Sequence, residues 1–222
     1  MERTLSKSEV PEVYAAKAPF YDVWAALTES KARRRALELA WVRDGESVLE
    51  VAVGTGLAFA ELLRRNPNGT TEGVDLTEAM LARARRRAER SPARRWRLRV
   101  GDAYSLDFAD DTFDLLLNCY MFDLLPEEDF PRVLGEFRRV LRTGGALVLV
   151  NMTRARHWRY RLWEALYRRR PAWVGGCRGV ELVGPVERAG FTVEAAELIS
   201  QFGFPSEVIL AVKRLASAPP PV

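Results

Sequence analysis

Cysteine, histidine and long apolar runs are scarce in this chain, and each shortage excludes a class of protein. The two cysteines, Cys119 and Cys177, cannot build a disulfide framework, and with the single histidine, His157, they are too few for a typical zinc site. No apolar run reaches the ~18 residues that a membrane-spanning helix needs, and the first residues lack the apolar core of a secretory signal. The sequence therefore predicts a metal-free, soluble, cytoplasmic domain.

An excess of one charge sign is also lacking. The chain has 34 Lys and Arg residues against 30 Asp and Glu residues, and its net charge is +4. That charge does not by itself argue for a nucleic-acid partner. Hydrophobic residues make up 48% of the 222 residues, which excludes a mostly disordered chain and is enough for the core of one domain.

Apolar strands and helical segments alternate through the middle of the chain, after a helical segment over 13–42. Strands are predicted at 47–53, 71–75, 96–100, 113–120 and 146–150, and helices at 57–65, 77–90 and 127–141. We expect Thr77 to cap the second of these helices and Gly144-Gly145 to end the third. This alternation is typical of an α/β fold with a doubly wound, mostly parallel sheet and helices on both faces.

The pattern changes after residue 151. A helix is predicted at 181–189, followed by strands at 191–198 and 208–212 with no helix between them. Two strands joined without a helical crossover favour antiparallel pairing. The sequence therefore predicts an antiparallel pair at the sheet edge.

Polar residues follow the predicted strands at the points where a doubly wound sheet forms its crevice. The first strand runs into Gly54-Thr55-Gly56, and Asp75 ends the second strand, 19 residues after Gly56. Asp102 follows the third strand, and Asn118 and Tyr120 end the fourth. Glycine permits a close approach to the backbone, and a carboxylate after the second strand can bind ribose hydroxyls. The alternatives are a tight turn at the loop, a helix-start role for Asp75, a turn role for Asp102 and a core position for Tyr120.

The order of these segments resembles the class I S-adenosylmethionine-dependent methyltransferases. The likeness runs from about Val48 to Thr153, and includes the Phe113-Asp114 strand and the motif Arg139-Val140-Leu141-Arg142-Thr143-Gly144-Gly145. Within this family, the chain is most similar to the branch that includes quinone C-methyltransferases and phospholipid N-methyltransferases, a branch that also has an N-terminal Tyr-Asp pair like Tyr21-Asp22. The resemblance implies a Rossmann-like, seven-stranded methyltransferase fold and S-adenosylmethionine as cofactor.

The resemblance implies that the loop after the first strand surrounds the methionine part and the ribose. Ala52, Gly54 and Gly56 would form that loop, and Tyr21 would join the cofactor site. Glu50 would hold the loop, or the cofactor amino group through water, because a buried acid needs a partner. The family has a glycine where this chain has Ala52, so that contact is the least secure.

Further roles follow for the ends of the second and third strands. By the same resemblance, Asp75 would bind both ribose hydroxyls, and Leu76 and Met80 would pack on the adenine. Asp102 would accept a hydrogen bond from the adenine amino group, and the Ala103 N–H would donate to the ring.

The reaction expected is an in-line displacement at the methyl group, for which alignment supplies much of the rate. The Asn118 carbonyl and Tyr120 would lie near the sulfonium. A general base is needed only if the acceptor must lose a proton, and the weak candidates are His157, Asp123 and Tyr14, or none.

The acceptor is expected to be a small molecule or a lipid, bound by segments that lie outside the repeating sheet. These are residues 14–24, the segment after Tyr120, and 152–180, which carry many aromatic side chains. The rings either line an acceptor pocket or pack a cap onto the domain. The basic, amphipathic stretch 154–170 is either a peripheral membrane contact or a solvated lid.

We therefore expect a single methyltransferase domain over residues 1–222. Its parts are an N-terminal helical cap (about 11–42), a cofactor-binding half (about 46–151), a lid or substrate insertion (about 152–180) and a segment that completes the sheet (181–213).

Three other functions compete with methyl transfer to a small molecule. A nucleic-acid methyltransferase would carry Asn or Asp before Pro-Pro-Tyr, whereas this chain reads Asn118-Cys119-Tyr120-Met121. A nicotinamide oxidoreductase would want a third glycine where Phe59 stands. A non-catalytic protein that binds adenosyl ligands stays open, as do the acceptor atom and the oligomeric state.

Overall fold

The computed structural model describes residues 22, 25–153 and 178–214. The predictions made for Tyr14, Tyr21, His157 and the stretch 154–170 lie outside the described residues.

The described ranges alternate between strands and helices, as the sequence predicts. The strands are β1 (Ser47–Val51), β2 (Thr70–Asp75), β3 (Trp96–Val100), β4 (Phe113–Cys119), β5 (Leu141–Met152), β6 (Phe191–Gln201) and β7 (Phe204–Lys213). The helices are α2 (Ser30–Leu39), α3 (Leu57–Arg65), α4 (Glu78–Ala88), α5 (Phe130–Val140) and α7 (Val183–Arg188), with the short 3-10 turns η1 (Phe122–Leu124) and η2 (Glu127–Asp129).

The seven strands form one sheet in the order β3-β2-β1-β4-β5-β7-β6. Neighbours from β3 through β5 pair in parallel, while β7 is antiparallel to both β5 and β6. The predicted antiparallel pair at the sheet edge is therefore confirmed. β7, second from that edge, is the strand that runs against the others. The order reverses between β1 and β4, which is where ligands bind in open α/β sheets.

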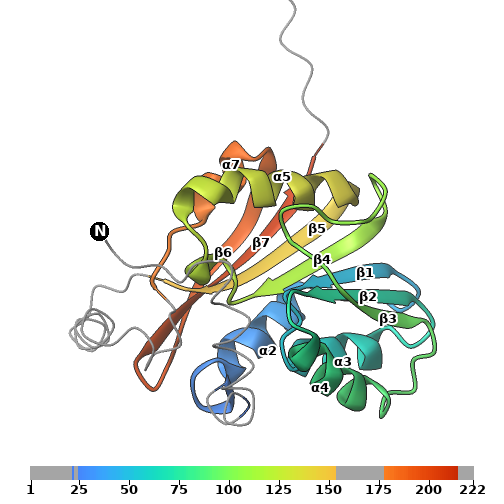
Figure 1. Ribbon diagram of the computed structural model, residues 1–222. Helices are drawn as coiled ribbons and strands as arrows, with labels where there is room; N and C mark the ends of the chain where they lie inside the picture. The colour runs from blue at the N-terminus through green and yellow to red at the C-terminus, as the bar shows by residue number, and fades with distance from the viewer. Residues whose placement is uncertain (1–21, 23–24, 154–177, 215–222) are drawn as a thin grey trace, which may run out of the picture.

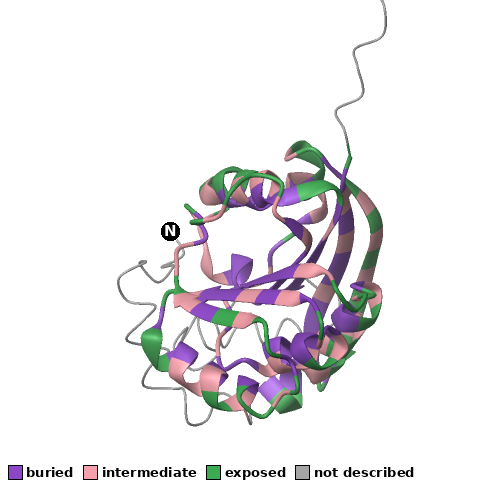
Figure 2. Cartoon of the chain, turned by 90° about the vertical axis from the view of Figure 1, so that its right-hand side faces the viewer, coloured by how far each residue is buried: buried purple, intermediate pink, exposed green. Residues whose placement is uncertain are grey.

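Helices cover both faces of the sheet (Figure 1). On one face, α5 and α7 pack on a core that includes Leu49, Leu116 and Leu149. On the other face, α2 and α3 pack on the alternate residues of the same strands, such as Val48 and Leu117. Buried residues follow the central strands and the inward sides of the helices (Figure 2). The near-continuous apolar runs of β1, β4 and β5 arise because both faces of these strands are covered.

The boundary between α5 and β5 differs from the prediction. The helix ends at Val140, β5 begins at Leu141 rather than Ala146, and the glycine pair does not end the helix. Leu141 is fully buried and pairs with Phe113, and the β4–β5 register then shifts before Ala146. Burial of one leucine therefore starts the strand before the glycines, which lie within it.

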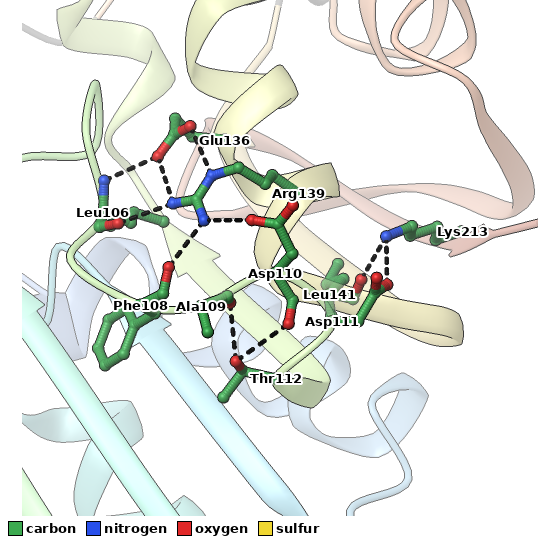
Figure 3. Close-up of polar contacts among 10 residues, drawn as sticks. All are labelled: Leu106, Phe108, Ala109, Asp110, Asp111, Thr112, Glu136, Arg139, Leu141 and Lys213. Atoms are coloured by element: carbon green, nitrogen blue, oxygen red, sulfur yellow. Dashed lines mark hydrogen bonds and ion pairs between the residues drawn. The ribbon is translucent and has the colours of Figure 1, made fainter.

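Arg139, from the motif that carries the family resemblance, anchors the segment between β3 and β4 (Figure 3). Its guanidinium donates to the carbonyl oxygens of Leu106 and Phe108, each at 2.7 Å, and pairs with Glu136 at 2.9 Å and Asp110 at 2.8 Å. This segment begins just after Asp102, so Arg139 supports the crevice by holding the chain that follows it.

No helix within the described ranges is both long enough and apolar enough to cross a membrane.

Candidate functional site

The loop after β1 adopts backbone conformations that side chains disfavour. Ala52, Gly54 and Gly56 all have positive φ angles, of 58°, 56° and 81°. A Cβ placed on Gly54 would meet nothing within 4 Å, so a ligand can approach the backbone there, whereas one on Gly56 would lie 2.8 Å from the Ala84 Cα. Gly56 therefore lets α3 begin against α4, and Gly54 leaves the loop accessible.

Asp75, at the end of β2, joins this loop to the start of α4. One carboxylate oxygen accepts the Gly54 N–H and the other accepts the Thr77 N–H, each at 2.8 Å. Burial raises the pKa of Asp75, and the hydrogen bonds from Gly54 and Thr77 act in the opposite direction. The Thr77 hydroxyl also bonds Asp75 and caps no helix N–H, so the prediction that its side chain caps the helix is wrong.

The residues predicted to surround an adenine lie at the ends of β2 and β3. Asp102 accepts the Tyr104 N–H at 3.1 Å, which is the geometry of a turn, and Ala103 is buried beside it. Leu76 is 39% exposed and lies next to Asp75. Met80 is buried, with 2% of its surface exposed, so Leu76 is the better placed of the two to meet a ligand.

Glu50 is a buried acid on β1. Only 2% of its surface is exposed, and its Oε2 has no hydrogen-bond partner. Burial raises its pKa well above the usual value; the charge of Arg33 lowers it, and that of Asp75 raises it further. Arg33 therefore supplies an opposite charge to this acid, while Oε2 itself has no hydrogen-bond partner.

Asn118 and Tyr120 lie two residues apart at the end of β4, but their side chains contact different parts of the structure. The Asn118 amide donates to the Val51 carbonyl at 2.8 Å and ties β4 to β1, while its Oδ1 is buried with no hydrogen-bond partner. The Tyr120 hydroxyl bonds the Ser206 hydroxyl at 2.8 Å, and its ring packs in the core beneath α2. Tyr120 therefore packs in the core, and its role near the sulfonium stays a prediction.

Asp123 is the one candidate base within the described residues. It lies in η1, its side chain is fully buried, and its backbone carbonyl accepts the Arg178 N–H at 3.2 Å. The other two candidates, Tyr14 and His157, lie outside the described residues.

The sequence predictions missed a polar pair, Asn151 near the end of β5 and Glu207 near the start of β7. They are direct cross-strand partners, and they share the face of the sheet that carries Leu149 and Ile209. Asn151 is fully buried with neither amide atom hydrogen-bonded, and Glu207 Oε2 also lacks a partner. The available signal was the amide that directly follows the apolar run 147–150.

Comparison with known proteins agrees with this geometry. The sequence profile of a methyltransferase-domain family matches residues 48–145. The chain is 38% identical over 134 residues to a phosphatidylethanolamine N-methyltransferase of Cereibacter sphaeroides, covering 59% of this chain and 62% of that protein. It is 36% identical over 146 residues to a ubiquinone/menaquinone biosynthesis C-methyltransferase of Paracoccus denitrificans, covering 64% and 58%.

The chain thus spans about three fifths of the length of these curated relatives. Among solved structures, it is similar to a methyltransferase of Haloferax volcanii that was solved in complex with the Trm112 methyltransferase activator. The TM-score is 0.74 at 18% identity, covering 94% of this chain and 99% of the other, a likeness of fold.

A sheet of this order with a glycine loop after β1 and an acid after β2 defines a Rossmann-like nucleotide-binding fold. With the matched profile and relatives, the assignment becomes more specific: residues 48–145 match a methyltransferase domain, and the chain is similar to class I S-adenosylmethionine-dependent methyltransferases, the quinone C-methyltransferases among them. The resemblance seen in the sequence is confirmed.

Proposed function

We propose that this chain transfers a methyl group from S-adenosylmethionine to a small-molecule or lipid-like acceptor. The observation that carries the proposal is the hydrogen bond of 2.8 Å from the Gly54 N–H to the Asp75 carboxylate, which joins the loop after β1 to the end of β2, beside the point where the strand order reverses. The similarity to known proteins supports it, because the relatives are named as N- and C-methyltransferases of phospholipid and quinone pathways.

The residues present fit an adenosyl ligand. The space beside Gly54 is open, and a carboxylate offers about four acceptor positions. At Asp75, the Gly54 N–H and the amide and hydroxyl of Thr77 use three of them. One position is therefore free for a ribose hydroxyl, and a second becomes free if the Thr77 hydroxyl turns away.

The remaining assignments are part of the same proposal. Ala52 and Gly56 shape the loop, Glu50 faces the cofactor amino group, and Asn118 presents its backbone carbonyl to the sulfonium. Leu76 and Ala103 contact the adenine, and Asp102 binds its amino group.

S-adenosylmethionine supplies a methyl group on a positively charged sulfur, whose departure as a neutral thioether needs no activation by the protein. The task of the chain is then to hold and align the reactants and to exclude water, and such alignment supplies up to about 7–11 kcal/mol of the barrier. An acceptor that must lose a proton also needs a base. Among the described residues, Asp123 is the candidate, being buried just beyond β4.

The acceptor would lie beyond Tyr120, at the ends of β4 and β5, near the buried Asn151 amide, whose two polar atoms have no hydrogen-bond partner. A peripheral membrane contact through 154–170 belongs to the same proposal, because lipids and quinones reside in membranes. Flotation with anionic vesicles tests it separately from catalysis.

Titration calorimetry tests the central proposal. Purified protein is titrated with S-adenosylmethionine, S-adenosylhomocysteine and NADH, beside the variant Asp75→Ala and the control Glu187→Gln, which changes an exposed acid on α7. We expect both adenosyl ligands to bind the unaltered protein and the control, and to be lost with Asp75→Ala. Binding of NADH alone would overturn the proposal. Adenosyl binding without methylation of any phospholipid, quinol or acyl-carrier acceptor would leave a non-catalytic binding protein.

A further inference from the structure

Three residues from distant parts of the chain meet at the glycine loop. The Thr55 hydroxyl donates to Asp22 Oδ1 at 2.6 Å, and the Arg87 guanidinium donates to Asp22 Oδ2 at 2.9 Å. Arg87 also donates to the Thr55 carbonyl oxygen. Asp22 precedes the sheet, Thr55 lies between Gly54 and Gly56, and Arg87 is in the last turn of α4.

This cluster fixes Thr55 at both ends of the residue. Its hydroxyl is held by Asp22 and its carbonyl by Arg87, and only 2% of its surface is exposed. The carbonyl of Thr55 belongs to the peptide plane that joins it to Gly56. The Gly54 N–H is held by Asp75, and the Gly56 N–H donates to the Val53 carbonyl at 3.0 Å. Arg87, at the Thr55 carbonyl, therefore adds a third restraint to this loop of two glycines.

We propose that Asp22 is a positioning residue of the cofactor site, which acts through Thr55 and Arg87 to hold the loop 54–56 in its binding conformation. The inference rests on the proposed function, since it concerns the affinity of the same site. The proposal also gives the acid of the Tyr21-Asp22 pair a role that needs no contact with the cofactor: Asp22 holds the loop through Thr55 and Arg87.

Electrostatics favours a role in positioning over one in stability. The Arg87 and Asp22 side chains are 30% and 35% exposed, and ion pairs this exposed contribute little to folding. The hydrogen bonds from Thr55 and Arg87 and the charges of Arg87 and Arg83 still hold the pKa of Asp22 below its usual value, against the opposing effect of partial burial. Asp22 is therefore an ionised acceptor at neutral pH, and its loss should appear in ligand affinity before it appears in melting temperature.

The experiment measures S-adenosylhomocysteine affinity by calorimetry and melting temperature by scanning fluorimetry. The variants are Asp22→Ala, Asp22→Asn, Thr55→Val and Thr55→Ser. The matched control is Glu197→Gln, which breaks an ion pair of similar exposure between Arg35 and Glu197, where β6 meets α2. Each variant is measured at low and high salt, because screening weakens the Asp22–Arg87 pair.

We expect Asp22→Ala and Thr55→Val to weaken affinity about tenfold, the loss typical of one hydrogen bond to a charged group. Thr55→Ser, which keeps the hydroxyl, should keep the affinity of the unaltered protein. Asp22→Asn should have an affinity between those of the unaltered protein and Asp22→Ala, and that affinity should no longer depend on salt. Melting temperatures should match that of Glu197→Gln. Unchanged affinity in Asp22→Ala, or an equal loss in Glu197→Gln, would overturn the inference. If the unaltered protein binds no adenosyl ligand, the proposed function has failed instead.

Discussion

Replacement of the buried acid Glu50 by glutamine should stabilise the protein in a manner that depends on pH. Burial raises the pKa of Glu50 in the folded state well above 4.5, the value of an unperturbed glutamate. Above pH 4.5 the folded protein therefore binds one proton more at this site than the unfolded chain, and its stability falls as pH rises toward the folded pKa. The maximal slope is about 1.4 kcal/mol per pH unit. Glutamine has the shape of the protonated acid and does not titrate, so Glu50→Gln escapes this loss.

The assay is a series of melting curves for the unaltered protein and Glu50→Gln between about pH 5 and pH 8. For a chain of this length, about 1.4 kcal/mol corresponds to roughly 3–5 °C, so the advantage of the variant should grow by up to that amount per pH unit. Glu187→Gln, at an exposed acid, is the control and should show no such growth. The same variant should bind S-adenosylmethionine more weakly, because glutamine, unlike the acid, cannot release a proton and pair as a carboxylate with the amino group. A melting difference that is constant across the pH range would refute the reasoning.

Two more substitutions test strain and packing at the site. Ala52→Gly removes a methyl group from a residue with φ of 58°; relief of about 1–2 kcal/mol of strain outweighs the roughly 0.5–1 kcal/mol entropic cost of glycine. Urea denaturation should thus show a net gain of about 0.5–1 kcal/mol, and a loss of stability would contradict the strain. Tyr120→Phe removes the hydrogen bond to Ser206, which should cost about 1–2 kcal/mol in the same assay and leave cofactor affinity within about twofold; a large loss of affinity at unchanged stability would instead place the hydroxyl at the ligand.

Much of the fold could be predicted from the sequence because its signals are local. The apolar runs of β1 and β4 indicate strands that are buried on both faces. The alternation of strands with helices indicates that neighbouring strands pair in parallel. The boundary at Leu141 could not be predicted, because the burial of that leucine depends on its pairing with Phe113, 28 residues earlier. Local glycine signals favoured a longer helix, and tertiary packing overrode them.

The site divides in the same way. The strand-end residues Asp75 and Asn118 were predictable from topology, because parallel strands bring their carboxyl ends to one edge. The hydrogen bond from Tyr120 to Ser206 could not be predicted, because Ser206 lies 86 residues away on an antiparallel strand. The anchor at Asp22 is hidden for the same reason: no local pattern links it to Thr55 or to Arg87.

The β6–β7 hairpin has a consequence for the order in which the chain can fold. Gln201, at the end of β6, accepts the Lys31 N–H at 2.8 Å and donates to the Ala26 carbonyl at 3.0 Å, across 170 and 175 residues of sequence. The segment that enters α2 is thus synthesised well before its polar partner, which lies 170 residues or more further along the chain. Closure of such distant contacts is slow. The start of α2 should therefore gain its polar anchor last, after the β6–β7 hairpin has formed, although the helix already packs on β1 and α3.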